Sequence, residues 1–156
     1  MSPINPPLAY LITFTCYGQW LHGDERSSVD RKHNKYETEF VKPNQELYAE
    51  QTKKMRQTPV ILGDEERKIV EKTIKEVCSY RKWELLEINV RTNHVHVVAT
   101  GNTIPDKIMG DFKAYATRRL KESGFFVKNV WTEGGSTRYL WDDESVVAAC
   151  HYARNQ

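Results

Sequence analysis

Two histidines, His94 and His96, lie two residues apart in an apolar run of the chain. Alternate side chains of an extended strand project from the same face, so both imidazoles can bind one divalent metal ion while Val95 packs inward. A metal ion in that position can polarise a phosphate ester. Tyr115 follows about twenty positions downstream, in a segment with helical periodicity. A tyrosine held beside such a phosphate can attack it and form a covalent ester, so these residues predict nucleophilic chemistry at a phosphodiester.

Length and composition predict one globular domain spanning residues 1–156. The chain has 39% hydrophobic and 28% charged residues, a balance that supports a buried core and argues against a disordered chain. Its 23 basic and 21 acidic residues nearly cancel, so net charge does not indicate nucleic-acid binding and local clusters must do so. Three cysteines without CxxC spacing, and no apolar run near membrane-spanning length, predict a cytoplasmic protein with reduced thiols and no membrane partner.

The pattern of hydrophobic residues predicts four strands, at residues 8–17, 85–90, 94–100 and 125–131. It also predicts three helices, at residues 64–81, 103–123 and 142–152. Asp64 is the expected N-cap of the first helix. Residues 18–63 are polar and irregular, which indicates a long loop insertion with a short helix at 45–55.

This order of elements is that of an α+β, ferredoxin-like, split βαββαβ fold. We expect an antiparallel four-stranded sheet with its first and third strands in the centre, two helices on one face, and a short C-terminal helix after the fourth strand. The two histidines would then lie in mid-sheet, and the helix that follows them could carry Tyr115 toward them. The fold alone does not specify a reaction.

At this point the residues resemble a known family. The run Asn93-His94-Val95-His96-Val97-Val98, followed by a helical tyrosine in Asp111-Phe112-Lys113-Ala114-Tyr115, resembles single-tyrosine transposases of the IS200/IS605 type, and especially their relatives associated with repetitive extragenic palindromes. The resemblance covers most of the chain. It implies a Mg²⁺- or Mn²⁺-dependent endonuclease and strand transferase that acts on single-stranded DNA folded into hairpins. His94 and His96 would be metal ligands, and Tyr115 would form a 5′ phosphotyrosine and leave a free 3′ hydroxyl.

The sequence departs from the family pattern at the third metal ligand. Many members place a glutamine one helical turn after the tyrosine, whereas this chain has Arg119 there. Asp111 and Glu133 are substitutes on chemical grounds only. The family's tyrosine serves its own subunit or that of a partner, so a homodimer is an option.

Several residues could bind DNA. Four cations surround Tyr115 on its predicted helix and would either bind phosphates or form a solvated cationic face: Lys113, Arg118, Arg119 and Lys121. Trp20 and Arg26 follow the first strand and suit the stacking of unpaired bases, although Trp20 could equally pack over the sheet edge. Arg138 could contact a phosphate or lie on a strand edge.

Three functions remain open at this stage. The first is a metal-dependent strand transferase. The second is a hairpin-binding relative with lost or altered catalysis, which Arg119 at the glutamine position favours. The third is a metal-assisted or two-histidine phosphoesterase that hydrolyses RNA or small nucleotides. It ranks last because two-histidine phosphoesterases usually carry two separated HxT or HxS motifs and this chain has a single HxH.

Overall fold

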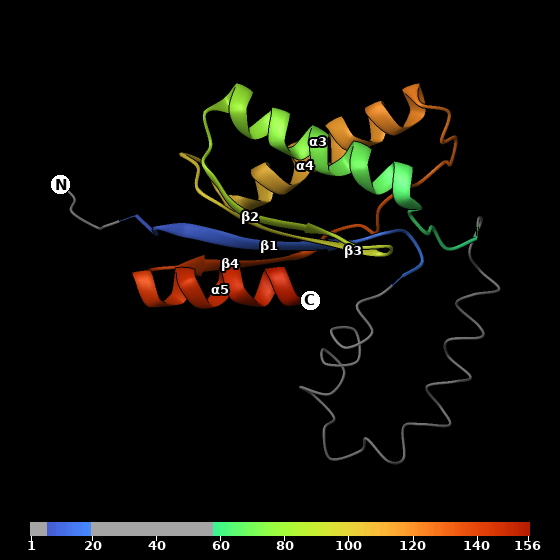
Figure 1. Cartoon of the computed structure of the whole chain (residues 1–156). Coiled ribbons are helices and arrows are strands. Elements are labelled where there is room, and N and C mark those ends of the chain that lie inside the picture. The colour runs from blue at the N-terminus through green and yellow to red at the C-terminus, as the bar shows by residue number, and fades with distance from the viewer. Residues whose placement is uncertain (1–5, 20–57) are drawn as a thin grey trace, which may run out of the picture.

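The computed structural model describes residues 6–19 and 58–156, and Figure 1 shows these residues as a mixed α+β fold. The described elements are, in chain order, β1 (Ala9–Thr15), α3 (Asp64–Arg81), β2 (Leu85–Val90), β3 (His94–Ala99), α4 (Pro105–Glu122), β4 (Ser136–Leu140) and α5 (Asp143–Asn155). This order confirms the predicted ferredoxin-like fold. The predicted helix at 45–55 and most of the predicted insertion lie outside the described residues.

The four strands form one antiparallel sheet in the order β2-β3-β1-β4, so β1 and β3 are the central strands, as predicted. All seven residues of β1 are buried, because this strand is covered on both faces. The register places Thr13 and Asn89 opposite His96, one on each neighbouring strand. The histidine motif therefore lies in the middle of the sheet.

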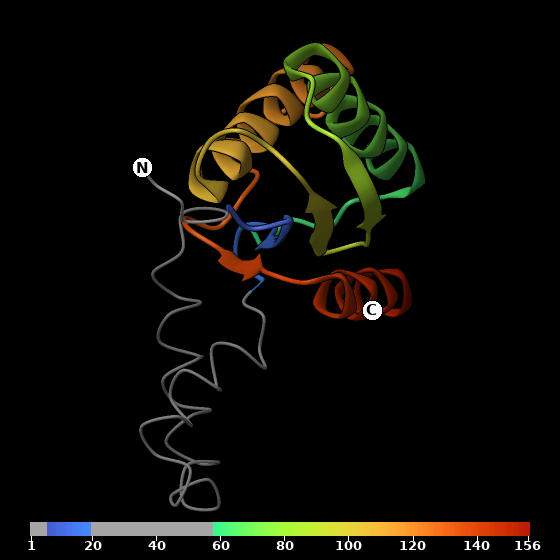
Figure 2. The same ribbon diagram turned by 90° about the vertical axis from the view of Figure 1, so that its left-hand side faces the viewer.

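The two faces of the sheet carry different layers (Figures 1 and 2). Helices α3 and α4 cover one face, where Phe14 of β1 and Phe112 of α4 belong to the larger core cluster. Helix α5 covers the opposite face, where Leu11, Val98 and two alanines of α5 belong to a smaller cluster. Successive residues of β1 therefore pack alternately against the helix pair and against α5.

The fourth strand is not at residues 125–131, where the apolar pattern predicted it. Phe125, Val127 and Trp131 pack against the larger core cluster from a loop, and the Trp131 indole donates to the Lys113 carbonyl oxygen at 3.2 Å. The strand that pairs with β1 is Ser136–Leu140, and Leu140 is its one buried residue. Residues 125–131 form no strand, although Trp131 makes an isolated β-bridge with Cys16. Burial of side chains against the larger core cluster explains the apolar pattern of this segment.

The start of α3 also differs by one residue from the prediction. Gly63, not Asp64, is the N-cap, and its backbone N–H donates to Glu66 Oε1 at 2.9 Å. Asp64 is the first residue of the helix and adds a negative charge to its first turn. None of the helices in the described ranges has the length and apolar character needed to cross a membrane.

Candidate active site

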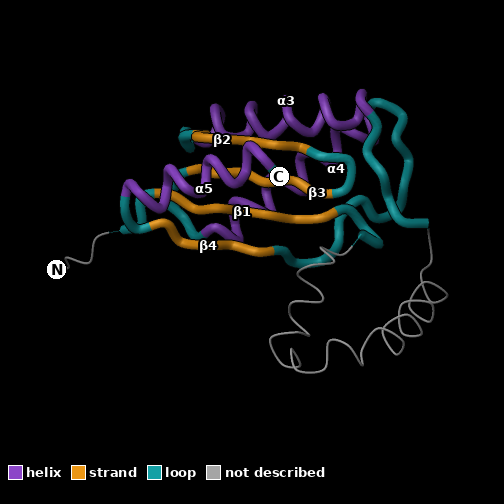
Figure 3. Tube along the Cα trace, turned by 60° about the horizontal axis from the view of Figure 1, so that its bottom comes forward, coloured by secondary structure: helices purple, strands orange, loops and turns teal. Residues whose placement is uncertain are grey.

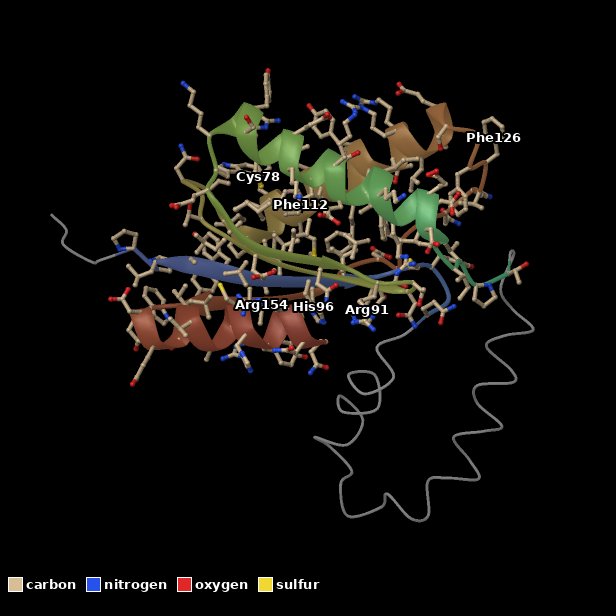
Figure 4. The ribbon with its side chains drawn as sticks, in the orientation of Figure 1. Cys78, Arg91, His96, Phe112, Phe126 and Arg154 are labelled. Carbon is tan, nitrogen blue, oxygen red and sulfur yellow. The ribbon has the colours of Figure 1, made fainter. Side chains whose placement is uncertain are left out.

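His94 and His96 lie at the start of β3 and face the side of the sheet that α5 covers. Their ring centroids are 4.8 Å apart, so the two imidazoles lie close enough to act on one ligand. His96 is buried, with 3% of its surface exposed, whereas His94 is partly exposed. Figure 4 shows His96 below the sheet, beside α5.

Both histidine rings are hydrogen-bonded at Nδ1. Asn93 Oδ1 accepts a hydrogen bond from Nδ1 of His94 at 2.7 Å, and Thr13 Oγ1 and His96 Nδ1 form a hydrogen bond of 2.8 Å. Any metal coordination by either ring would therefore use Nε2. Metal-binding histidines in proteins are usually held in this way by a partner at the other nitrogen.

Burial, together with the nearby positive charges of His94 and Arg91, lowers the pKa of His96 to about 4. His96 is therefore neutral at physiological pH, as a metal ligand must be. The donor set and its charge state fit a divalent metal ion.

Arg91 is a cation that the sequence analysis did not single out. It lies in the turn between β2 and β3, and its backbone N–H donates to the His94 carbonyl oxygen at 2.8 Å. Figure 4 shows its side chain near that of His96. Within the described part of the chain, no carboxylate forms an ion pair with this exposed arginine.

Tyr152 of α5 is the tyrosine beside the histidine pair. Its ring centroid is 5.3 Å from that of His96, with 67° between the ring planes. The side chain is also accessible, because 47% of the residue surface is exposed. A phenol in this position can reach a phosphate that also contacts the histidines.

The attachment of α5 to the sheet explains the position of Tyr152. Ala149 and Ala153 are buried, and their small side chains allow the helix to approach the strands closely. Asn89 of β2 donates to the Ala153 carbonyl oxygen at 2.9 Å, and Arg154 forms an ion pair with Glu87 of β2 at 3.0 Å. Figure 3 shows α5 crossing this face of the sheet. These contacts hold the last turns of α5 against the strands that flank the histidines.

Gln156 follows Tyr152 by one helical turn and is the C-cap residue of α5. Residues four apart lie on the same side of a helix, so Gln156 extends the side of α5 that carries Tyr152. This is the tyrosine-to-glutamine spacing that the family resemblance implies. That spacing was the signal in the sequence that could have identified Tyr152, but the predicted helix ended at residue 152 and left Gln156 outside it.

The prediction that α4 brings Tyr115 to the histidines is wrong for the fold of a single chain. Tyr115 packs against the larger core cluster on the opposite face of the sheet, and the Arg118 guanidinium lies 5.2 Å from its ring centroid. The physical reason lies in β3. Val95 and Val97 point to the face that α4 covers, so the alternating histidines must point to the other face.

The two predicted third ligands do not join the histidine pair. Asp111 lies on α4 and forms ion pairs with Lys107 at 2.8 Å and with Arg81 at 3.2 Å. Among the residues that the structure describes, no group of three or more His, Cys, Asp or Glu side chains is arranged to bind a metal ion, which also leaves Glu133 outside such a site.

Two of the predicted DNA-binding cations have structural partners. Lys113 Nζ donates to the carbonyl oxygens of Thr132 and Gly134 at 2.9 and 2.6 Å, and burial lowers its pKa. Arg119 forms an ion pair with Glu76 of α3 at 2.8 Å. Both cations thus attach α4 to a neighbouring segment.

The other predicted DNA-binding residues fall in three places. Arg118 and Lys121 are exposed on α4, across the sheet from the histidines. Arg138 is exposed on β4 and pairs with Leu11, which places it on the face that carries the histidines. Trp20 and Arg26 lie outside the described residues.

Comparisons with known proteins assign this chain to a family. A search of curated proteins gives no match. The chain is similar to the crystal structure of a candidate transposase from Deinococcus radiodurans R1, with 12% identity, a TM-score of 0.55, and coverage of 100% of this chain and 95% of that one. It is also similar to a REP-associated tyrosine transposase bound to a REP hairpin, with 11% identity, a TM-score of 0.53, and coverage of 98% and 70%. These two similarities show a shared fold. The model of the family described as "Transposase IS200 like" matches residues 51–155, which is more than half of the chain, so the chain belongs to the IS200-like transposase family.

Proposed function

We propose that this transposase cleaves and rejoins single-stranded DNA through a 5′ phosphotyrosine intermediate formed by Tyr152. The observation that carries this proposal is the position of Tyr152, whose ring centroid is 5.3 Å from that of His96. The family membership supports DNA transposition, and the histidine pair supplies the part of the site that would bind a metal ion.

In the proposed reaction, the Tyr152 oxygen attacks the scissile phosphorus and the phenolic proton passes to solvent. A bond forms between this oxygen and the phosphorus as the bond to the 3′ oxygen breaks, and the departing oxygen takes up a proton to become a free 3′ hydroxyl. A second 3′ hydroxyl later attacks the phosphotyrosine, which restores Tyr152 and joins the strands. The ester conserves the energy of the broken bond, so ATP is not required.

His94, His96 and Gln156 would hold the divalent ion, with Mg²⁺ and Mn²⁺ as the proposed choices. When bound, the ion would polarise the phosphate and stabilise the charge that develops on its oxygens. The hydrogen bonds between Nδ1 of each ring and its partner, Asn93 for His94 and Thr13 for His96, would keep both rings oriented during the reaction.

Single-stranded DNA with a hairpin is the proposed partner. A structural relative of the same fold is bound to a REP hairpin. On this chain, Arg91 and Arg138 lie on the histidine side of the sheet and are exposed, so both suit phosphates on either side of the cleaved one. Strand β4 is separated from β3 by β1, so the two strands lie two strand spacings, about 10 Å, apart. Arg138 would therefore contact a neighbouring phosphate rather than the scissile one.

The alternative of a binding protein without catalysis was suggested by the arginine that follows Tyr115 where many family members have a glutamine, and the structure removes this support. Arg119 follows Tyr115 at the glutamine position, but Arg119 pairs with Glu76 and Tyr115 lies across the sheet from the histidines. The tyrosine that faces His96 is followed by a glutamine at the expected spacing.

The test compares Tyr152→Phe with Tyr115→Phe, since each variant removes one phenolic hydroxyl and keeps the ring. Each protein is incubated with labelled single-stranded hairpins from the DNA flanking its gene, with Mn²⁺ or with EDTA, and denaturant-resistant adducts are measured. We expect a metal-dependent adduct with wild type and with Tyr115→Phe, and none with Tyr152→Phe or His96→Ala.

Other outcomes would overturn this assignment. Loss of the adduct in Tyr115→Phe alone would return the nucleophile to α4, acting on the site of a partner. Cleavage that persists in Tyr152→Phe without an adduct would indicate hydrolysis. Hairpin binding by wild type with no cleavage in Mn²⁺ would favour the binding protein.

A further inference from the structure

We propose that Thr13 is a positioning residue that fixes the tautomer of His96, by accepting a hydrogen bond from Nδ1–H and so leaving the Nε2 lone pair available for the metal ion. This inference rests on the proposed function, because it concerns the same metal site. It assigns a role to a residue of β1 that has no place in the histidine motif.

The geometry of the central strand pair supports this role. Thr13 lies directly opposite His96 in the register of β1 and β3, and the two side chains project from the same face. Thr13 Oγ1 and His96 Nδ1 are 2.8 Å apart. The two residues are 6% and 3% exposed, so solvent has little access to replace this hydrogen bond.

A neutral imidazole carries its single proton on either Nδ1 or Nε2, and only the nitrogen without the proton can coordinate a metal ion. A hydroxyl that accepts from Nδ1–H stabilises the tautomer in which Nε2 has the lone pair. Asn93 Oδ1 has the same relation to Nδ1 of His94 at 2.7 Å. The two rings would then present the same nitrogen, each directed by a polar side chain from a different part of the chain.

The identity of the residue is consistent with this role. A valine would satisfy the strand position equally well, because β-branched side chains suit a buried central strand. Threonine keeps the β-branched shape and adds one hydroxyl, which is used on His96. Removal of that hydroxyl should therefore change the histidine more than the strand.

The experiment compares wild type with Thr13→Val, Thr13→Ser and Thr15→Val. Thr15 is the matched control, because it lies opposite His94 on the same strand and is similarly buried, while Asn93 holds the His94 ring. The tautomer of His96 is read from the ¹⁵N chemical shifts of its ring in the metal-free full-length protein. The affinity for Mn²⁺ is measured separately by electron paramagnetic resonance, without DNA.

We expect the wild-type ring to carry its proton on Nδ1. Thr13→Val should lose that preference and bind Mn²⁺ about 10- to 100-fold more weakly, the usual cost of removing a residue that orients a metal ligand. Thr13→Ser should restore both properties, and Thr15→Val should leave both unchanged.

Three results would overturn the proposal. The first is a wild-type His96 with its proton on Nε2, which can be measured even if Thr13→Val does not fold. The second is an unchanged Mn²⁺ affinity in folded Thr13→Val, and the third is a Thr13→Ser variant as defective as Thr13→Val. Because none of these measurements uses DNA, a failure of the strand-transfer proposal would show separately, as an absent adduct in a protein whose His96 tautomer and Mn²⁺ binding are as expected.

Discussion

Burial keeps His96 neutral well below the pH at which an exposed histidine takes up a proton. The pKa of this residue falls from its ordinary value of 6.5 to about 4 in the folded protein, mainly because the ring is removed from water. Between these two values the unfolded chain binds more protons than the folded one, so the free energy of unfolding must decrease as the pH falls. Above the ordinary histidine pKa this residue contributes no pH dependence.

We therefore expect stability to decline from about pH 6.5 to about pH 4, by on the order of 3 kcal/mol from His96 alone. Urea unfolding in the presence of EDTA, repeated across this range, measures the effect without bound metal. His96→Gln removes the titrating group and should flatten the pH dependence. Parallel curves for wild type and variant would show that His96 is protonated as easily in the folded protein as in the unfolded chain.

We expect Lys113 to stabilise the fold rather than to bind DNA. Its ammonium group donates to two backbone carbonyl oxygens in the segment before β4. Lys113→Met keeps the length of the side chain and should lower the free energy of unfolding by about 1–3 kcal/mol, because both carbonyls lose a charged partner. Hairpin affinity should stay at the wild-type value.

Lys121→Met is the matched control for this prediction, since Lys121 is exposed on the same helix. Its effect on stability should stay within about 0.5 kcal/mol. Thermal unfolding and a hairpin titration on the same samples separate the two roles. A Lys113→Met protein with normal stability and weakened DNA binding would restore Lys113 to the DNA surface.

At the level of elements, the strands and helices with a strong hydrophobic periodicity could be predicted from the sequence. Helix α3 and strands β1, β2 and β3 lie where the pattern places them, to within a residue or two at the ends. Strand β4 could not be predicted in the same way, because it is an edge strand with one buried residue. The loop before it buries Val130 and packs Phe125 and Trp131 on the core, so its composition is more apolar than that of the strand itself.

The candidate site could be predicted only in part. The histidines are identified by a contiguous motif. Which tyrosine lies beside them depends on which helix covers their face, and that is decided by packing across the whole sheet. Helix α5 packs mainly through Ala149 and Ala153, and alanines give a weak hydrophobic signal. Choosing a tyrosine by its nearness in sequence to His96 led to Tyr115, whereas the alternation of valine and histidine in β3 excludes the face that carries it.

The attachment of α5 to β2 gives a prediction at this scale. Asn89 donates to the Ala153 carbonyl oxygen at 2.9 Å and to that of Arg154 at 3.4 Å, so it satisfies two carbonyls at the end of the helix. Asn89→Ala should lower the free energy of unfolding by only about 1 kcal/mol, but should loosen the last turn that carries Tyr152. We expect faster amide hydrogen exchange in residues 150–156 and a lower rate of adduct formation.

Asn102→Ala serves as the control, because it removes the same amide group from a residue that is exposed in the loop after β3. It should change neither hydrogen exchange in α5 nor the rate of adduct formation. An Asn89→Ala protein with wild-type exchange in these residues would show that Glu87, through its ion pair with Arg154, is sufficient to hold the helix.

For the whole molecule, the sheet separates the larger core from the proposed active site. The face covered by α3 and α4 holds the larger core and the ion pair between Glu76 and Arg119. The opposite face holds the histidines, Tyr152 and a smaller cluster beneath α5. Strand β1 is buried on both faces and carries Phe14 to the core and Thr13 to His96, so one strand couples the stability of the fold to the orientation of the site.

This division predicts which cations bind DNA. Arg91 and Arg138 lie on the histidine face, whereas Arg118 and Lys121 lie on α4 across the sheet. Arg91→Gln and Arg138→Gln should each weaken binding of a single-stranded oligonucleotide and reduce the slope of log affinity against log salt concentration by about 0.7, the value for one lost phosphate contact on a single strand. Arg118→Gln and Lys121→Gln should change neither quantity. All four substitutions remove one positive charge, so a uniform effect would mean that net charge attracts the DNA. An effect confined to Arg118 and Lys121 would place the DNA strand on the face opposite the histidines. Only a loss confined to Arg91 and Arg138 fits a strand that crosses the sheet beside Tyr152, because the phosphate that reacts must also lie on that face.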